Sequence, residues 1–434
     1  MYWQPEFECM ARENLEQLQL ERLQATLYRV GTHVPFYRRR LREAKVDYES
    51  ITSLASLQSL PFTTKQDLHD NYPYGLFAVP LRDVVRIHSS SGTTGMSTVM
   101  GYTRNDIKNW SDLVARIFRS AGVTPEDVVQ IAYDYGIYTG GLGLHYGAER
   151  LGASVIPIAS GNIKRQIRIM RDFKTTALVC TPSHSLKIAE VMMETGVNPS
   201  GLSLRYGLFG AEPWSETMRR EINERLGILA TDNYGLAEVM GPGVAGECRE
   251  CNGLHINEDH FLIEVLDPST LVPVAPGEVG ELVITTLTKE AFPVIRYRTR
   301  DLARILPEPC PCGRTLTRMS RILGRSDDML TIGGVNVFPD QIEAIISELN
   351  GKKPPYLIIV DREKYEDKLT VMVEVTEDLF FDEVKKQWAL AETIQDRLVT
   401  DLGIQVHVKL VEEKTLERID SKGKMVIDNR RILA

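Results

Sequence analysis

The sequence predicts an α/β protein made of a large N-terminal domain and a small α+β C-terminal domain. Between residues 83 and 233, short apolar runs alternate with longer amphipathic stretches, which is typical of βαβ units and parallel αβ layers. After Gly246, strand-like runs follow one another with turn residues between them, so we expect an antiparallel β subdomain there. Residues 324–328 have the composition of a boundary, so the predicted domains are residues 1–325 and 326–434, the second of about one hundred residues.

Each predicted element rests on its own local pattern. The strands of the parallel sheet are four apolar runs, at residues 128–132, 154–158, 177–180 and 206–209. Helical spacing of apolar residues predicts helices at residues 11–30, 163–173 and 185–194. The antiparallel strands are expected at residues 261–266, 281–285 and 302–306, and those of the small domain at 356–360, 369–375 and 405–411.

Length and composition exclude several classes of protein. The chain has 434 residues, of which 43% are hydrophobic and 25% are charged, and its mean hydropathy is −0.17, as in ordinary globular proteins. A net charge of −8 without a long basic block argues against a nucleic-acid partner. The N-terminus lacks the apolar run of a signal peptide, and no segment approaches the ~20 apolar residues of a membrane-spanning helix. We therefore expect a cytoplasmic protein with no membrane partner.

One loop is rich in hydroxyls and glycines and lies between two apolar runs. It consists of Ser89, Ser90, Ser91, Gly92, Thr93, Thr94 and Gly95. Glycine allows backbone N–H groups to turn toward an anion, and hydroxyls add further donors, so the loop suits a polyphosphate. It is not a Walker A loop, because Met96 follows where that pattern requires lysine after glycine. Taken alone, such a cluster is also typical of a surface linker.

Five further segments follow this loop in an informative order. They are Phe-Gly-Ala-Glu-Pro at 209–213, Asp-Asn-Tyr-Gly-Leu-Ala-Glu at 232–238, Tyr-Arg-Thr-Arg-Asp at 297–301, Gly-Arg-Ser-Asp-Asp at 324–328 and Ser-Lys-Gly-Lys at 421–424. In content and order they resemble the core motifs of adenylate-forming enzymes, which include acyl-CoA synthetases, peptide-synthetase adenylation domains and luciferases. Within that superfamily the chain resembles the phenylacetate–CoA ligase family, through residues 33–37, 60–65, 138–143 and 253–255. The resemblance covers almost the whole chain and implies the adenylate-forming fold with a mobile C-terminal domain.

The resemblance implies a ligase that uses ATP, Mg²⁺ and coenzyme A. An aryl acid such as phenylacetate attacks the α-phosphorus of ATP, and the acyl-adenylate then reacts with the thiol of coenzyme A. In such phosphoryl transfer a protein mainly positions the reactants and neutralises charge. The hydroxyl loop is then expected to hold the β- and γ-phosphates. Relatives often form homodimers, so a second copy of the chain is the protein partner that the resemblance allows.

Two charged residues are predicted to be catalytic. The family's catalytic lysine, which bridges the α-phosphate and the substrate carboxylate, matches Lys424, and the Val-Ile-Asp-Asn-Arg context at 426–430 favours it over Lys422. Glu238 is expected to hold Mg²⁺ against the phosphates. Without the surrounding motifs, the ordinary interpretation of both residues is a solvated surface charge.

The nucleoside of ATP has its own set of predicted residues. Asp301 is expected to accept hydrogen bonds from the ribose hydroxyls, with Arg325 beside it, although each alone is more often an ordinary salt-bridge partner. Tyr234 is expected to stack on adenine, with simple core packing as the alternative. The remaining predicted nucleotide-binding residues are Ala211, Glu212 and Pro213 on the opposite wall, and Asp232, Asn233 and Gly235 beside Tyr234.

The acid pocket is predicted around a tyrosine-rich segment. Its residues are Tyr133, Tyr135, Tyr138, Gly140 and Gly141, where tyrosines form an aromatic slot and glycines leave room for the ligand. The family often has glycine and phenylalanine where this chain has Asp134 and Tyr138. The added phenol of Tyr138 favours a hydroxylated aryl ring, and core packing of Tyr138 is the alternative.

Two segments of the chain are assigned to domain motion. The resemblance matches Asp327 to the hinge about which the small domain moves, although an exposed acidic turn is the plain interpretation. The following glycine-containing segment, residues 331–336, is expected to help form the pantetheine tunnel.

Four of the six cysteines fall in two close pairs, which in a reducing compartment suggests metal binding more than disulfides. The family resemblance implies a structural zinc here, for which we favour Cys248, His255, Cys310 and Cys312, with Cys251 as the reserve ligand. The alternative is a set of reduced thiols in loops.

Two other functions compete with the CoA ligase. One is an adenylating ligase that loads the thiol of a carrier protein instead of coenzyme A. The other is a non-catalytic relative that binds nucleotide or acid as a sensor. The sensor interpretation rests on two departures from the family pattern: Met96 replaces the usual loop lysine, and Ala237 replaces the usual serine or threonine.

Overall fold

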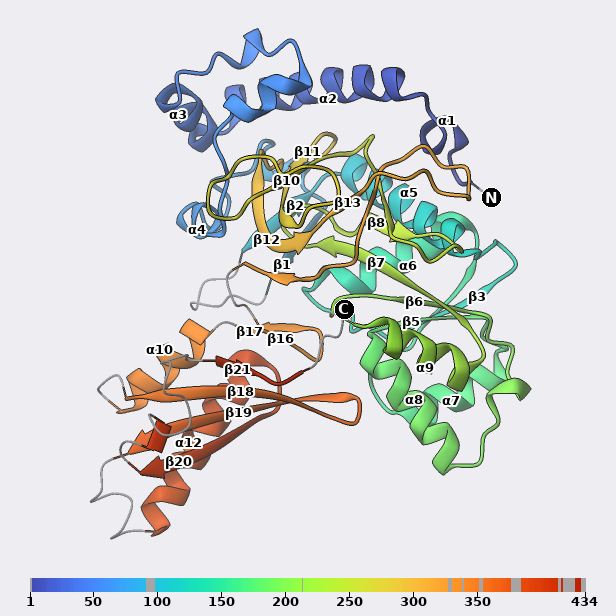
Figure 1. Ribbon diagram of the computed structural model, residues 1–434, viewed down its shortest axis with the longest axis vertical. Helices are drawn as coiled ribbons and strands as arrows, with labels where there is room; N and C mark the ends of the chain where they lie inside the picture. The colour runs from blue at the N-terminus through green and yellow to red at the C-terminus, as the bar shows by residue number, and fades with distance from the viewer. Residues whose placement is uncertain are drawn as a thin grey trace. The chain divides into compact units, whose positions relative to one another are not determined.

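The computed structural model describes residues 2–90, 98–212, 214–326, 330–337, 339–350, 354–375, 384–412, 415–416 and 426–430. These residues form two compact units, each with its own hydrophobic core (Figure 1). The first unit contains residues 2–90, 98–211 and 217–326, and the second is built mainly from residues 330 onward. In the described residues, we find no helix with the length and apolar character needed to cross a membrane.

A nine-stranded mixed sheet forms the centre of the first unit. Its strands, in spatial order, are β13 (Ile305–Leu306), β14 (Arg318–Met319), β9 (Leu254–Ile256), β8 (Gly241–Glu247), β7 (Leu229–Leu236), β6 (Tyr206–Phe209), β5 (Ala177–Cys180), β3 (Val128–Ile131) and β4 (Ser154–Pro157). Strands β4, β3, β5, β6 and β7 are parallel, as the alternating pattern predicts. From β7 to β13 the pairing is antiparallel.

The antiparallel subdomain expected after residue 246 is present, and antiparallel pairing also continues the central sheet beyond β7. The chain turns back directly after β7, and a tight connection of this kind permits only antiparallel pairing. Strands β8, β9, β14 and β13 therefore extend the parallel sheet. A separate four-stranded antiparallel sheet is also present, in the order β10 (Phe261–Leu266), β11 (Gly280–Thr286), β12 (Tyr297–Ala303) and β15 (Gly324–Arg325).

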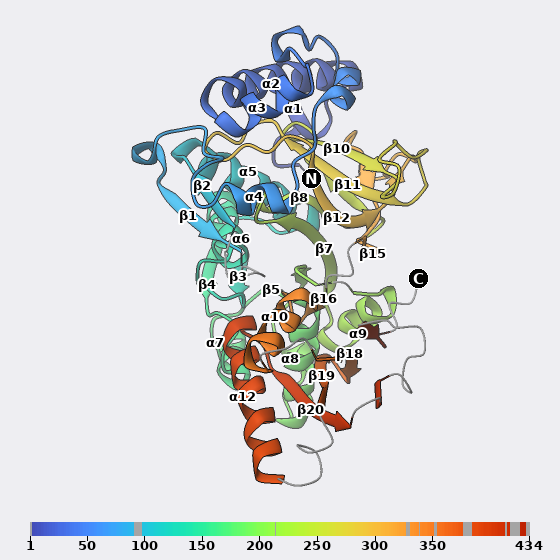
Figure 2. The ribbon, with the colours of Figure 1, turned by 90° about the vertical axis from the view of Figure 1, so that its left-hand side faces the viewer.

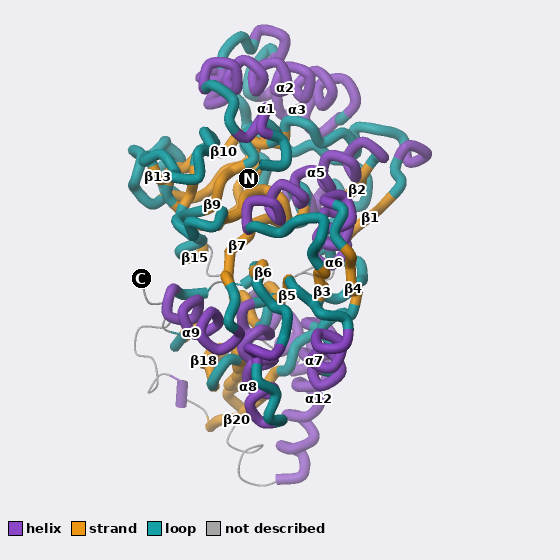
Figure 3. The backbone as a smooth tube through the Cα atoms, turned by 90° about the vertical axis from the view of Figure 1, so that its right-hand side faces the viewer, coloured by secondary structure: helices purple, strands orange, loops and turns teal. Residues whose placement is uncertain are grey.

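Helices cover both faces of the parallel sheet. Helices α5 (Arg104–Ala121) and α6 (Thr139–Leu151) lie on one face, and α7 (Ile163–Asp172), α8 (Pro182–Glu194) and α9 (Glu216–Leu226) lie on the other (Figure 3). Helices α5 and α6 pack closely because α6 is rich in glycine. A Cβ at Gly147 would lie 2.2 Å from Cγ1 of Val114, and one at Gly143 would lie 2.3 Å from the Trp110 ring.

The N-terminal segment adds a helical layer to the first unit. Its elements are α1 (Pro5–Glu8), α2 (Arg12–His33), α3 (Pro35–Glu43), α4 (Lys65–Asp70) and the 3₁₀ turns η1 (Tyr48–Ser50), η2 (Leu54–Ser59) and η3 (Leu81–Asp83); η4 (Pro199–Gly201) comes later. Helix α2 begins one residue after the helix predicted at residues 11–30 and extends three residues beyond it. It buries Leu15, Leu23, Leu27 and Val30 at helical spacing. A hairpin of β1 (Arg86–Ser89) and β2 (Val99–Tyr102) flanks the hydroxyl loop.

The second unit is a small α+β structure. Its main sheet has the order β20 (Val406–Glu412), β19 (Glu366–Val375), β18 (Tyr356–Glu363) and β21 (Val426–Asp428), with β19 parallel to β20 and β18 parallel to β21. Helices α10 (Pro339–Asn350) and α12 (Val384–Leu402) pack together and cover it, and β16 (Leu330–Ile332) and β17 (Val335–Val337) form a hairpin (Figure 2). Buried residues such as Ile358, Val371, Ile394 and Leu398 form its core.

Candidate functional site

The loops that follow the parallel strands are held together at one edge of the sheet. The hydroxyl of Tyr133, after β3, lies 2.8 Å from the carbonyl oxygen of Cys180 in β5 and 3.0 Å from that of Gly210 after β6. The amide of Ser89, at the end of β1, donates to the carbonyl of Ile137 at 3.0 Å. The hydroxyl loop thus begins beside the tyrosine-rich segment, at the edge where ligands of such sheets bind. The hydroxyl of Tyr133 thus donates to backbone carbonyls and ties these loops together.

The predicted ribose residues form one hydrogen-bonded cluster. Strands β12 and β15 pair so that Asp301 lies opposite Arg325, whose Nη1 lies 2.6 Å from Oδ1 of Asp301. The Tyr234 hydroxyl donates to the other carboxylate oxygen at 2.7 Å. Burial, reinforced by Asp301, raises the pKa of Tyr234 well above its ordinary value, so its phenol stays protonated and acts as a donor. A carboxylate oxygen has two lone pairs, so it can accept from a ligand hydroxyl in addition to one such contact.

The predicted adenine wall begins where β6 ends. Ala211 has a φ of +68°, in the left-handed region that non-glycine residues rarely adopt and that is concentrated at ligand sites. The preceding residue must be glycine, because a Cβ at Gly210 would lie 2.5 Å from the carbonyl oxygen of Asn233. The side chain of Asn233 donates to the carbonyl of Phe209 at 2.5 Å and so ties this turn to β7. Glu212 follows and is buried.

Beside this turn, Asp232 belongs to a network that the sequence motifs did not indicate. Its backbone amide donates to Glu247 at 2.7 Å, and Glu247 forms a buried ion pair with Arg219, also at 2.7 Å. The carboxylate of Asp232 lies 3.9 Å from Nε of Arg321. No local pattern marks Glu247, Arg219 or Arg321, because their partners are distant in the sequence.

Glu238 lies in the turn between β7 and β8 and is buried. The turn is tight, since a Cβ at Gly235 would lie 2.0 Å from the carbonyl oxygen of Gly241. Desolvation first, and then the charge of Glu238, raise the pKa of Tyr138 to about 12. The predicted magnesium ligand is therefore a neighbour of the predicted acid pocket.

Three residues of the predicted acid pocket lie around the start of α6. The ring of Tyr138 covers Gly140, where a Cβ would lie 2.4 Å from Cε1 of the tyrosine. Gly141 packs against the loop after β3, since a Cβ there would lie 2.4 Å from the carbonyl oxygen of Asp134. Tyr138 is 42% exposed, so it is not a core residue.

Tyr135 is held in place by a chain of hydrogen bonds along α6. Its hydroxyl lies 3.2 Å from Nδ1 of His145, and Nε2 of His145 lies 3.0 Å from a carboxylate oxygen of Glu149. A polar support of this kind limits the orientations that the Tyr135 ring can adopt.

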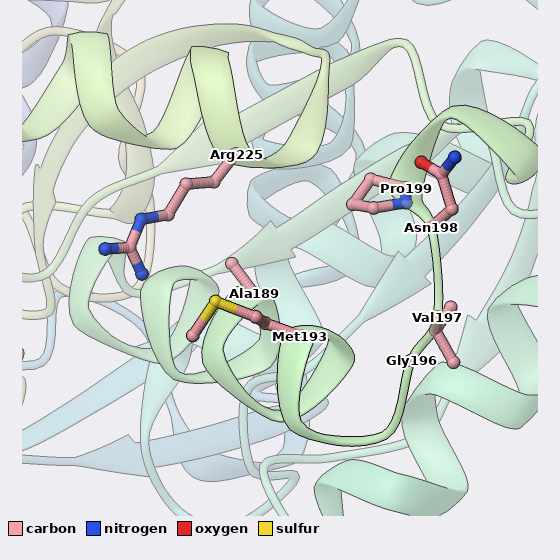
Figure 4. Close-up of a pocket in the computed structure, with 7 residues that line it drawn as sticks. All are labelled: Ala189, Met193, Gly196, Val197, Asn198, Pro199 and Arg225. Atoms are coloured by element: carbon pink, nitrogen blue, oxygen red, sulfur yellow. The ribbon is translucent and has the colours of Figure 1, made fainter.

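A hollow of about 450 Å³ lies elsewhere on the first unit (Figure 4). It is lined mainly by apolar residues of α8 and the segment after it, together with one arginine of α9: Ala189, Met193, Gly196, Val197, Asn198, Pro199 and Arg225. None of the predicted site residues lines this hollow.

The four favoured metal ligands form a compact group. Cys248 follows β8, His255 lies on β9, and Cys310 and Cys312 lie between β13 and β14. Their ligand atoms all lie within 4.8 Å of one another, with 3.7 Å between the sulfurs of Cys248 and Cys310 and 3.4 Å from the sulfur of Cys312 to Nε2 of His255. Tetrahedral zinc with Zn–S bonds of about 2.3 Å holds its sulfurs about 3.8 Å apart. The donor set and its spacing therefore fit a zinc ion.

Cys251, the reserve ligand, lies outside this group. Its sulfur lies 3.7 Å from the carbonyl oxygen of Ala230. The loop of Cys312 is also held by the N-terminus, through an ion pair of 2.7 Å between Arg314 and the buried Glu8 of α1.

Comparison with known proteins identifies the family. The AMP-binding enzyme family matches residues 16–288, and the AMP-binding enzyme C-terminal domain matches residues 334–430. A phenylacetate–coenzyme A ligase of Escherichia coli (strain K12) is 49% identical over 428 residues, 98% of this chain and 97% of the relative. One of Thermus thermophilus is 46% identical over 445 residues, 99% of this chain and all of the relative.

The chain belongs to the phenylacetate–CoA ligase family of AMP-binding enzymes. The predicted family is thus confirmed. A solved structure supports the predicted fold class as well: a 2-hydroxyisobutyryl-CoA ligase in complex with 2-HIB-AMP and CoA, with a TM-score of 0.93 and 31% identity over 99% of this chain and 93% of that one. The adenylate-forming fold is therefore confirmed, with its large mixed α/β domain and small C-terminal domain.

Several predicted residues of this family member lie outside the described residues. They are Ser91, Gly92, Thr93, Thr94, Gly95, Met96, Pro213, Asp327, Lys422 and Lys424. Their roles stay predictions from the sequence.

Proposed function

We propose that the chain joins an aryl acid such as phenylacetate to coenzyme A, using ATP and releasing AMP and pyrophosphate. The proposal rests on a sequence identity of 46–49%, over nearly the full length, with phenylacetate–coenzyme A ligases. In the first step a carboxylate oxygen bonds to the α-phosphorus of ATP, and the bond from that phosphorus to the bridging oxygen breaks, so pyrophosphate leaves. In the second step the thiol sulfur bonds to the acyl carbon, the carbon–oxygen bond to AMP breaks, and the thiol proton is released.

Asp301 is proposed to hold the ribose hydroxyls. The support is its buried carboxylate, which Arg325 and Tyr234 hold in position at 2.6 and 2.7 Å. Because these contacts exist before any ligand binds, the acceptor needs little reorganisation. We assign the adenine base to the neighbouring turn, with Ala211, Glu212 and Pro213 on one wall and Asp232, Asn233, Tyr234 and Gly235 on the other.

The phosphates are assigned to the hydroxyl loop, residues 89–95. Glu238 is the residue proposed to hold Mg²⁺, which would neutralise charge on the phosphates. Lys424 is proposed to stabilise the negative charge that develops as the carboxylate attacks. Lys424→Ala is expected to lose adenylation while thioester formation from supplied acyl-adenylate survives; unchanged adenylation in this variant would overturn the assignment.

The acid is assigned to the segment of Tyr133, Tyr135, Tyr138, Gly140 and Gly141. Support comes from the position of Glu238 beside Tyr138, since the acid must meet the phosphates. The phenol of Tyr138 also favours acids with a hydroxylated ring.

The two reactions are proposed to alternate through motion of the small domain. We place the domain boundary after Arg325 and the hinge at Asp327, and we assign residues 331–336 to the pantetheine tunnel. Each of the two units has its own core, which such motion requires.

We also propose a structural zinc held by Cys248, His255, Cys310 and Cys312. Its support is the spacing of the four ligand atoms described above. The ion would fasten β8 and β9 to the loop before β14, and all four positions are filled by protein ligands, so it takes no part in the reaction.

Pyrophosphate release across a panel of aryl acids, with and without coenzyme A, tests the function. The proposal predicts release with phenylacetate or a hydroxylated analogue, and thioester only when coenzyme A is present. If the acyl-adenylate reacts with a carrier-protein thiol but not with coenzyme A, the assignment of coenzyme A as the acceptor is wrong. No release with any acid would favour the non-catalytic sensor.

A further inference from the structure

Helix α7 and the two residues after it carry a concentration of positive charge, although the chain as a whole is acidic. The net charge of the chain is −8, yet residues 163–174 contain five basic residues and a single acidic one, Asp172. The basic residues are Lys164, Arg165, Arg168, Arg171 and Lys174, and all five are exposed. The buried side of the helix is formed by Gln166, Ile167 and Met170. The outer side of α7 would therefore attract an anionic ligand.

The N-terminal end of α7 lies at the edge of the sheet that carries the predicted site. Oδ1 of Asp134, in the tyrosine-rich segment, accepts from the amide of Ser160 at 3.1 Å and from its hydroxyl at 2.7 Å. Gln166 donates to the carbonyl of Gly161 at 2.6 Å, and its Oε1 lies 3.3 Å from Nε2 of His184 in α8. Lys164 and Arg165 therefore stand beside the loops that follow β3 and β5.

The C-terminal end of α7 lies at the opposite edge. Arg171 and Lys174 come just before β5 begins at Ala177, whereas the site lies where β5 ends. Positive charge is therefore present at both ends of α7, near the site at the N-terminal end and farther from it at the C-terminal end.

Within the described residues, four of these five basic side chains form no ion pair, namely Lys164, Arg165, Arg168 and Lys174. Arg171 pairs with Asp172 at 3.2 Å. Lys164 and Arg168 are four residues apart, and Arg165 and Arg168 are three apart, so these like charges are helix neighbours that repel one another. An anion bound between them would relieve that repulsion.

We propose that Lys164, Arg165 and Arg168 bind the phosphates at the nucleotide end of coenzyme A. This inference rests on the proposed function, in which coenzyme A is the thiol acceptor. Coenzyme A carries its thiol at one end of a long pantetheine arm, and a diphosphate and a 3′-phosphate at the other. The thiol must reach the acyl carbon, while the phosphates stay at the surface, where exposed lysine and arginine form charge-assisted hydrogen bonds with them.

The test is steady-state kinetics with the double variant Lys164→Glu/Arg165→Glu. Its KM for coenzyme A is expected to rise about tenfold with little change in kcat, because two favourable exposed contacts become repulsive ones. For dephospho-coenzyme A, which lacks the 3′-phosphate, the rise is expected to be smaller, so that the preference for coenzyme A over this analogue shrinks. Added salt is expected to raise KM for coenzyme A in the parent chain and to have less effect in the variant.

The matched control is Arg171→Glu/Lys174→Glu, which makes the same change of charge at the far end of the helix. Its KM for coenzyme A is expected to stay within about twofold of the parent value, since exposed charges at that distance are largely screened. Thermal unfolding of both variants tests whether they are folded. Equal increases in KM in the two variants, or an unchanged preference between the two thiols in the first, would overturn the inference.

Pyrophosphate release without coenzyme A keeps this test separate from the proposed function. If the parent chain releases no pyrophosphate, the proposed ligase activity is contradicted. Release in the parent chain, combined with unchanged coenzyme A kinetics in Lys164→Glu/Arg165→Glu, would contradict only the phosphate site on α7.

Discussion

The Asp301 cluster and the Cys248 group are both sets of partly or fully buried polar side chains in the first unit, but they differ in how far the protein satisfies them. Both carboxylate oxygens of Asp301 already have a partner, Arg325 on one and Tyr234 on the other. The sulfurs and the imidazole of the Cys248 group lie within 4.8 Å of one another and are weak hydrogen-bonding partners. The difference suggests that the first site accepts an exchangeable ligand at little structural cost. The Cys248 group, in contrast, is expected to be stabilised mainly by a permanently bound ion.

The largest expected effect is on activity at Asp301. Asp301→Asn is expected to lower kcat/KM for ATP in pyrophosphate release about 100-fold, because hydrogen bonds to a charged acceptor contribute about 1.5–3 kcal/mol each. Zinc content is expected to stay at the parent value. Equal kinetics in variant and parent would remove Asp301 from the nucleotide site.

The next effect is on stability and concerns the Cys248 group. Cys310→Ser is expected to lose the bound zinc and to lower the unfolding midpoint by about 5 °C or more, since loss of a structural metal is among the costly changes. Hydrogen exchange is expected to rise in α1, because Glu8 contacts the loop of Cys312 through Arg314.

Cys251→Ser is the matched control for this prediction. Its sulfur lies near the carbonyl of Ala230 and apart from the four ligands, so zinc content measured by metal analysis should not change. Loss of zinc in Cys251→Ser but not in Cys310→Ser would mean that the ligands were assigned wrongly.

A smaller effect is expected at Tyr234. Tyr234→Phe removes one hydrogen bond to Asp301 and leaves Arg325 in place, so KM for ATP is expected to rise about fivefold, in line with about 1 kcal/mol for such a bond. A change of 100-fold would indicate instead that the hydroxyl of Tyr234 itself contacts the nucleotide.

The smallest expected effect is on pH dependence. Burial raises the pKa of Tyr234 well above its ordinary value of 10.0, so its neutral form persists and no proton leaves it between pH 7 and pH 9. The pH profiles of pyrophosphate release in Tyr234→Phe and the parent chain are therefore expected to have the same shape in this range. A step present only in the parent chain would show that the phenol ionises.

Local sequence patterns predicted the elements more accurately than the pairing between them. The runs at 177–180 and 206–209 coincide with β5 and β6, since an apolar run bounded by turn residues defines a strand locally. The pairing of β7 with β8, which extends the parallel sheet, depends on contacts beyond the range of such patterns. Arg219 and Glu247 were missed for the same reason, because each is an ordinary charged residue until the fold brings them together.

The same contrast holds for the candidate site. The spacing of the cysteines and the family motifs singled out the residues that the structure places together, both at Cys248 and at Asp301. Neither signal indicated that the hydroxyl of Tyr133 is used by the carbonyls of Cys180 and Gly210, because hydrogen bonds to backbone groups leave no trace in residue type. The basic residues of α7 are visible in the sequence as well. Their position at the edge of the candidate site became clear only from the fold.

The central claim is that the acid attacks the α-phosphorus of ATP, and the transfer of an oxygen isotope tests it most directly. Phenylacetate labelled with ¹⁸O in its carboxylate is incubated with the chain, ATP, Mg²⁺ and coenzyme A, and AMP is analysed by mass spectrometry. The account predicts that each AMP released with the thioester carries one labelled oxygen, since that oxygen bridges acyl carbon and phosphorus in the adenylate. Label in inorganic phosphate with formation of ADP, or thioester formed with unlabelled AMP, would contradict it.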